Sequence, residues 1–216
     1  MCAPRQSVAN QVSSRYAVAC EQIDAANAQD PTLLVYRGTA HCKEILHSEM
    51  MTAWVERLDP EADESQLLAA RAHHFRRWVY PRADYPAGRS GYLKWRAQAK
   101  KNQAAEVAQL LLNCGYSEEF TQRVGSIIRK EQRTTNPAVQ THEDALCLVF
   151  LDTQLDAVAN RMGDAEMIEV IAKTLPKMSP LGIQSASLLE LSPSGVALVT
   201  QAVAEFTKSS SAEGDL

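Results

Sequence analysis

The chain has 216 residues, of which 45% are hydrophobic and 22% charged; these values are ordinary for a globular protein and untypical of a disordered one. One domain is expected, because domains usually have about 100–200 residues. The formal net charge of −4 argues against general nucleic-acid binding, and nine glycines and nine prolines are few for a β-rich protein.

Hydrophobic residues recur at three- and four-residue steps along most of the chain, which predicts an all-α bundle of about eight to ten helices. The expected helices span approximately residues 6–28, 41–58, 63–78, 92–113, 117–133, 137–155, 163–175, 180–191 and 193–206. We expect one helical domain over residues 1–208 and a flexible polar tail over residues 209–216.

Two connections between the expected helices are notable. Residues 32–39 are short and apolar, and we interpret them as a loop or an extended connector. Residues 79–91 contain two prolines and two glycines and predict a loop of about a dozen residues. Loops of that length inside a compact domain are uncommon and are often functional.

The cysteines and the hydropathy pattern indicate where in the cell the protein is expected. Five cysteines, an odd number with no CxxC pair, do not fit a disulfide framework or a zinc-thiolate site, and indicate a reducing compartment. No window approaches the run of about 18 apolar residues that a membrane span needs, and the N-terminus lacks the apolar core of a signal peptide. We therefore expect a cytoplasmic protein without a membrane partner.

Positive charge is concentrated in one segment. Residues 71–101 contain nine Lys or Arg and one acidic residue, Asp84, so this segment carries +8 and the rest of the chain −12. A basic island in an acidic chain favours a confined anionic ligand over a long polyanion.

Histidines and carboxylates on three expected helices are candidate metal ligands. They are His47 on the second helix, His73-His74 on the third, and His142-Glu143-Asp144 near the start of the sixth. Such groups, where they converge in a bundle core, commonly hold a divalent metal ion. The alternative is that they are satisfied polar residues near the core or at the surface.

The order of these residues resembles HD-type metal-dependent phosphohydrolases, which have a lone His, then an apolar run ending in a His-Asp pair, then a distant Asp. The resemblance implies His47, His74 and Asp144 as ligands of one divalent ion (Mn, Fe or Zn), with His73 and Glu143 as catalytic groups. The chain departs from the pattern, since His73-His74 replaces His-Asp and Gln103 stands where many such proteins have His. These departures favour a degenerate site with one softer metal or none.

Four stretches of the sequence resemble an uncharacterised family, domain of unknown function 4202. They are Leu46–Trp54, Arg76–Arg96, Gly115-Tyr116 and Glu143–Leu151, and the resemblance covers about residues 16–205. In the family pattern His74 is the matched histidine, His73 is a variable neighbour, and other members have His in place of Gln103. No activity follows from this resemblance.

The Arg- and aromatic-rich segment suits an anion with a flat or apolar part. Arginine binds phosphate bidentately, and aromatic rings stack on a base or on a guanidinium. The candidate ligand-binding residues are Arg77, Trp78, Arg82, Tyr85, Arg89, Tyr92, Trp95 and Arg96. The alternative is structural: arginines that bind carbonyls and carboxylates, with aromatic packing, hold an irregular loop in place.

Two functions therefore remain open. The first is an HD-like metal-dependent phosphohydrolase that binds or hydrolyses a small phosphorylated ligand such as a nucleotide. The second is a non-enzymatic binding or regulatory module whose segment 76–96 docks an anionic metabolite, an acidic protein segment or RNA. A third, purely structural use of the segment is an oligomeric scaffold. Metal content separates the first two.

Overall fold

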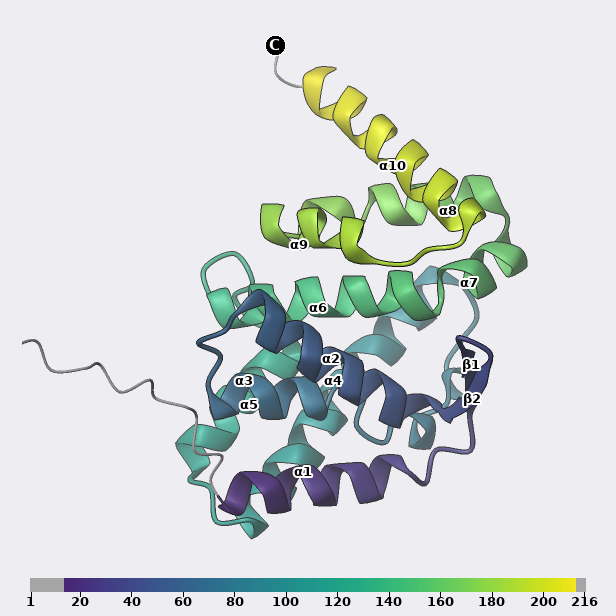
Figure 1. The fold of residues 1–216 in the computed structure, drawn as a ribbon. Helices are drawn as coiled ribbons and strands as arrows, with labels where there is room; N and C mark the ends of the chain where they lie inside the picture. The colour runs from purple at the N-terminus through teal and green to yellow at the C-terminus, as the bar shows by residue number, and fades with distance from the viewer. Residues whose placement is uncertain (1–13, 213–216) are drawn as a thin grey trace, which may run out of the picture.

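The computed structural model describes residues 14–212, and within them ten α-helices, four short 3-10 turns and one two-stranded sheet form the fold (Figure 1). The predicted all-α bundle is confirmed. The first expected helix appears as α1 (Ser14–Asn27), and residues 6–13 of that prediction lie outside the described residues. No helix of the described part combines the length and the apolar composition that crossing a membrane requires.

Helix α3 (Glu64–Arg71) lies at the centre of the fold. Its Leu68 packs in a core with residues of α1, α4 (Gly88–Asn113) and α5 (Glu118–Arg129). Its Leu67 and Ala70 pack in a second core with α2 (Lys43–Leu58) and α6 (Pro137–Thr153). Because α3 is short and buried on both faces, the residues that follow it also enter the interior.

The C-terminal helices form a layer on the far side of α6 (Figure 1). They are α7 (Leu155–Met162), α8 (Asp164–Ala172), α9 (Pro180–Ser185) and α10 (Pro193–Ala212). Apolar residues of α7, α8 and α10 form a third core with Leu151 of α6. Helix α10 continues into the predicted tail, since it ends at Ala212, and residues 213–216 lie outside the described residues.

Residues 33–42 form a β-hairpin, at the place where the sequence predicts a loop or an extended connector. Strand β1 (Leu33–Tyr36) pairs antiparallel with β2 (Thr39–Cys42), and Tyr36 lies opposite Thr39. The two turn residues, Arg37 and Gly38, both have positive φ (49° and 80°), as the tight two-residue hairpin turn requires. The hairpin brings the chain directly into the first turn of α2.

The third predicted helix was too long. Helix α3 ends at Arg71, not near Trp78, because His74 and Arg76 adopt left-handed backbone conformations (φ 60° and 49°) that an α-helix cannot contain. The chain then makes 3-10 turns at Arg77–Val79 and Arg82–Asp84.

The predicted loop over residues 79–91 is therefore shorter than expected, and α4 begins at Gly88, not at Tyr92. Gly88 has φ +81°, and a Cβ on Gly91 would lie 1.8 Å from the carbonyl oxygen of Pro86. The loop backbone thus packs directly against the first turn of α4, which requires glycine at position 91.

Candidate metal and anion site

Glu44 and His47 share one face of α2. The two residues are three apart on the helix, so their side chains project from neighbouring positions. Both are buried, with 2% of each residue exposed. Glu44 belongs to the first turn, where the helix dipole favours a negative charge.

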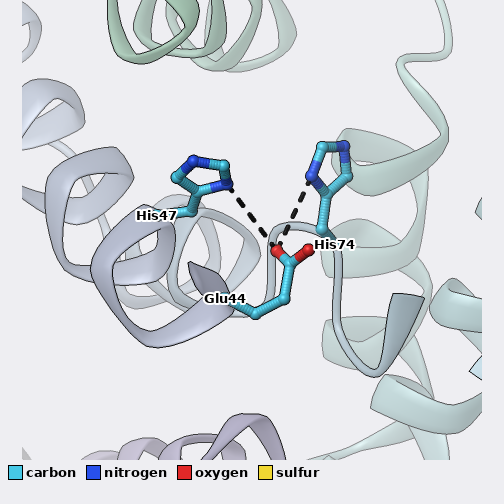
Figure 2. A group of neighbouring side chains, drawn as sticks. All are labelled: Glu44, His47 and His74. Carbon is cyan, nitrogen blue, oxygen red and sulfur yellow. Dashed lines mark ion pairs between the residues drawn. The ribbon is translucent and has the colours of Figure 1, made fainter. Parts of the chain in front are cut away.

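His74 meets them from the other side. Asp63 and Gln66 form a capping box that fixes the start of α3, and the left-handed turn after its end directs the His74 ring toward α2. A left-handed backbone at a non-glycine residue costs free energy and is uncommon, and it occurs at tight turns and at functional sites. Figure 2 shows both imidazole rings turned toward the Glu44 carboxylate.

The three side chains offer donor atoms to one point. Glu44 Oε2 lies 3.8 Å from His47 Nδ1 and 3.8 Å from His74 Nδ1, and all three donor atoms lie within 4.8 Å of one another. These separations are too long for hydrogen bonds, and within the described residues neither Glu44 Oε2 nor His74 Nδ1 has a hydrogen-bond partner. Two ligands about 2.1 Å from one ion can lie up to about 4.2 Å apart, so the two separations of 3.8 Å fit a bound ion.

The surroundings of His47 determine which of its two ring nitrogens carries the lone pair. The Thr153 hydroxyl donates its proton to the carbonyl of Val149 at 2.7 Å, so its oxygen can accept from His47 Nε2 at 3.4 Å. His47 then carries its proton on Nε2 and turns the lone pair of Nδ1 toward Glu44. Such an acceptor behind the ring is the usual support of a metal-binding histidine.

The ionisation of the group follows from its burial. Burial raises the pKa of Glu44 to about 7, although Lys43 and Arg77 oppose the shift. Burial, with further contributions from Lys43 and Arg77, lowers the pKa of His47 to about 4. His47 is therefore a neutral ligand at pH 7, and Glu44 gives up its proton readily. Two imidazoles and one carboxylate suit Zn, Fe or Mn and leave coordination positions open.

Asp144, the third ligand expected from the sequence, is not in this group. Its carboxylate accepts hydrogen bonds from the backbone N–H of Ser179 at 2.8 Å, the hydroxyl of Ser179 at 2.5 Å and the amide of Gln140 at 2.9 Å. It therefore connects α6 to the start of α9. The structure brings His47 and His74 together as expected, but with Glu44 in place of Asp144.

A small cavity lies against His74 on the α4 side. About 30 Å³ of it is open to the centres of water molecules, room for roughly two waters. Its lining comes from the segment after α3, from α4, and from residues around the end of α5 and on α6. The lining residues are His73, His74, Arg77, Arg96, Ala99, Lys100, Gln103, Ile128, Lys130 and Leu146.

Cations without an ion-pair partner among the described residues dominate this cavity. Arg77, Arg96 and Lys100 form no ion pair with any carboxylate of residues 14–207. Burial, together with the neighbouring Lys130 and Arg96, lowers the pKa of Lys100 to about 8. Grouped cations that repel one another in a partly buried place cost free energy unless an anion joins them.

The neutral groups of the cavity add hydrogen-bonding capacity. Gln103 is 3% exposed, and its amide Nε2 has no hydrogen-bond partner. His73 Nδ1 lies 3.2 Å from His142 Nε2, while His73 Nε2 has no partner. Burial, then the nearby His142 and Lys130, lowers the pKa of His73, so its ring is neutral.

Glu143, a catalytic candidate, is held in an ion pair. Its Oε2 lies 2.5 Å from Nζ of Lys130, and both side chains are about nine-tenths buried. Burial opposes the charge of Glu143, but Lys130 outweighs it and lowers the pKa of this carboxyl. The pair leaves Lys130 at the edge of the cavity with its charge balanced.

The predicted ligand-binding residues divide into two groups. Arg77 and Arg96 line the cavity. Arg82 instead donates to the carbonyls of Tyr85, Pro86 and Gly88 at 2.8, 2.8 and 3.3 Å, which is the structural role that the sequence left open. Arg89 is exposed on the first turn of α4, away from the cavity lining.

The aromatic residues Tyr92 and Trp95 pack against the two cavity arginines. The guanidinium of Arg77 lies 4.6 Å from the Trp95 ring, Trp95 lies 5.8 Å from the ring of Tyr92, and Arg96 lies 5.6 Å from that ring. Tyr92 is 42% exposed. Trp78 and Tyr85 are half-buried and do not line the cavity.

A comparison with protein families identifies the family of the chain. The family described as Domain of unknown function (DUF4202) matches residues 17–199. The chain belongs to this family. No curated protein and no solved structure matches the chain. The DUF4202 resemblance is thus confirmed, whereas the likeness to HD-type phosphohydrolases stays a prediction.

Glu44, Lys100 and Lys130 were missed as site residues. The Glu-x-x-His spacing of Glu44 and His47 is the signal that could have found Glu44, because residues three apart share a helix face. No local pattern distinguishes Lys100 or Lys130 from surface lysines. Their partners are set by the packing of α4 and α5 against the segment that follows α3.

Proposed function

We propose that the chain is a metal-dependent phosphohydrolase-type protein that binds or hydrolyses a small phosphorylated ligand such as a nucleotide. One observation carries the proposal. A two-histidine, one-carboxylate group, in which Glu44 and His47 are buried, lies beside a cavity in which three of the four cations form no ion pair within the described residues, and His74 belongs to both. Metal ions and clustered cations are the two devices that stabilise charge in phosphoryl transfer.

Glu44, His47 and His74 would hold one divalent ion, for which Mn, Fe and Zn are the candidates. Such an ion supplies an activated water or polarises a phosphate ester. The neutral imidazole of His73, supported by His142, faces the same cavity and is the candidate to accept or donate the proton. Glu143, in its ion pair with Lys130, positions that lysine.

The phosphate oxygens would be received by Arg77, Arg96 and Lys100, with the Gln103 amide as a further donor. Burial of unpaired cations makes an anion a favourable partner, since it supplies the missing counter-charge. Arg96 and Lys100 are only partly buried, so their long side chains can move outward to admit a group larger than two waters. The exposed ring of Tyr92 offers a surface for a flat part of the ligand.

The second candidate is a non-enzymatic module that binds an anion without metal. The donor-rich cavity favours it, because Arg77, Arg96, Lys100 and Gln103 can hold an anion with no ion at Glu44. An anionic metabolite fits the small cavity better than an acidic protein segment or RNA.

Metal analysis of the untagged protein, purified without chelators, tests the proposal. We expect about one equivalent of a divalent transition metal, lost in Glu44→Gln and His47→Asn variants and kept in a His41→Asn control. His41 lies on β2 outside the group. A phosphate-release screen against nucleotides follows. Metal-free protein that stays so after incubation with manganese, iron and zinc, yet binds nucleotides, would support the second candidate.

A further inference from the structure

His74 lies between the metal group and the cationic cavity, and its two ring nitrogens face different partners. Nδ1 lies 3.8 Å from Glu44 Oε2 and has no hydrogen bond. Nε2 contacts Nη1 of Arg77, within hydrogen-bonding reach. Arg77 also lines the cavity, so one guanidinium connects the two halves of the site.

The proton of His74 can occupy only one of these nitrogens in the neutral ring. A guanidinium has donors and no acceptor. The contact with Arg77 therefore requires a lone pair on Nε2, which places the proton on Nδ1. An ion bound at Nδ1 requires a lone pair on that nitrogen, which places the proton on Nε2. The Nε2–H group and the Arg77 guanidinium, both donors, would then face each other. The Arg77 bond and a metal bond at His74 exclude one another.

His47 shows the contrast. Behind its ring lies the Thr153 hydroxyl, whose own proton is used on Val149, so this ring can already present Nδ1 as a lone pair. A metal-binding histidine normally donates its other N–H to an acceptor in this way. His74 has a donor in the place where His47 has an acceptor.

We propose that Arg77 couples the two halves of the site, so that a divalent metal ion and a tetrahedral anion each strengthen the binding of the other. Metal binding moves the His74 proton from Nδ1 to Nε2, with no net gain or loss of protons at this ring, and releases the Arg77 guanidinium to the anion. An anion that binds Arg77 withdraws it from Nε2 and frees His74 for the metal. This inference rests on the proposed metal site.

Zinc titrations with and without sulfate test the coupling. Sulfate is a tetrahedral dianion that does not precipitate zinc, and chloride keeps the ionic strength equal. We expect saturating sulfate to raise the zinc affinity of the wild type at least about fivefold, the lower end of typical couplings. By the reciprocity of linked binding, zinc then raises the sulfate affinity by the same factor.

Two methionine variants separate this coupling from simple attraction between zinc and sulfate. Arg77→Met removes the competing bond, so zinc affinity without sulfate rises about twofold to tenfold, and sulfate then changes it less than twofold. Arg96→Met also removes a cavity cation but leaves the Arg77–His74 contact intact, so coupling persists at saturating sulfate. Coupling that survives in Arg77→Met, or is absent from the wild type, overturns the inference.

The ring of His74 gives a second readout on the unaltered protein. Nitrogen NMR distinguishes the two neutral tautomers, and a His74→Asn spectrum assigns the signal. We expect the proton on Nδ1 without metal and on Nε2 with zinc. A proton on Nε2 in the metal-free protein overturns the inference. If zinc does not bind at all, the proposed function fails with it, whereas zinc binding without coupling removes the inference alone.

Discussion

Glu44 Oε2 and His47 Nδ1 lie 3.8 Å apart on the same face of α2, both buried, and share no hydrogen bond. The Thr153 hydroxyl behind His47 turns a lone pair toward the carboxylate, so two acceptors face each other in the metal-free protein. Such an arrangement destabilises the fold unless a proton or a metal ion lies between them.

Replacing Glu44 by the isosteric Gln should stabilise the metal-free protein at pH 8. Burial raises the pKa of Glu44 from 4.5 to about 7, so the folded state favours the protonated form and loses stability as pH rises from about 4.5 through 7. We expect the free energy of unfolding of Glu44→Gln to exceed that of the wild type by about 1–3 kcal/mol at pH 8.

Urea unfolding at several pH values, with chelator present, measures this difference. It should shrink as the pH falls from 7 and vanish below about pH 4.5, where Glu44 becomes protonated in both states. The low pKa of His47, about 4, works in the opposite direction, since the folded state loses stability as pH falls below 6.5. This loss occurs in both proteins and cancels in the comparison. An equal or lower stability of Glu44→Gln at pH 8 would contradict a buried, charged Glu44.

Metal affinity should rise with pH and level off near pH 7. Only Glu44 must release a proton in this range, because burial keeps His47 neutral above about pH 4 and lowers the pKa of His74 as well. We expect about a tenfold gain in affinity per pH unit between pH 5 and 7. Isothermal titration with zinc in non-chelating buffers measures the slope. A gain of about a hundredfold per unit would mean that a histidine is also displacing a proton.

Replacing Asp144 by Ala should destabilise the protein and leave its metal content unchanged. The carboxylate receives three hydrogen bonds from Ser179 and Gln140 and is 3% exposed, so its loss leaves buried donors unpaired, at a cost of about 2–3 kcal/mol. Asp144→Asn keeps one acceptor and should cost less. Loss of metal from folded Asp144→Ala protein would restore Asp144 as a ligand.

The arginines of segment 76–96 should separate into structural and ligand-binding groups. Arg82→Ala removes bonds to three carbonyls and should lower stability by about 1 kcal/mol while changing sulfate affinity less than twofold. Arg96→Met and Lys100→Met remove unpaired cavity cations and should weaken sulfate binding at least about fivefold without lowering stability. Thermal unfolding and sulfate titration measure both quantities. Equal losses of affinity in all three variants would contradict this separation.

Replacing Gly91 by Ala should be strongly destabilising, because the new Cβ would lie 1.8 Å from the carbonyl oxygen of Pro86 and the loop backbone would have to move. We expect a loss of about 3 kcal/mol or more. Gly163 has a positive φ (95°), but a Cβ added there would meet open space. Gly163→Ala therefore serves as the control for backbone strain alone. Thermal unfolding compares the two, and a smaller loss for Gly91→Ala would argue against this close contact.

The all-α class and most helices were predictable from the chain alone, because three- and four-residue periodicity and caps such as Ser117 and Asn136 are local properties. The family was predictable from matched stretches such as Arg76–Arg96. The sequence also identified His47, His74 and the arginine segment as chemically unusual. Helix ends at Arg71 and Gly88 were not predictable in this way, since they depend on left-handed residues and on the approach of Pro86 to Gly91.

Which carboxylate joins the two histidines depends on tertiary packing. Glu44 and Asp144 are both buried acidic residues on helices, and either fits the order of ligands along the chain of a metal site. Spacing alone does not show which of the two is the ligand. The packing of α2 against the segment after α3 brings Glu44 to His74, while Ser179 takes Asp144 away. Ligand convergence is a long-range property, set by how helices pack and not by the residues within any one of them.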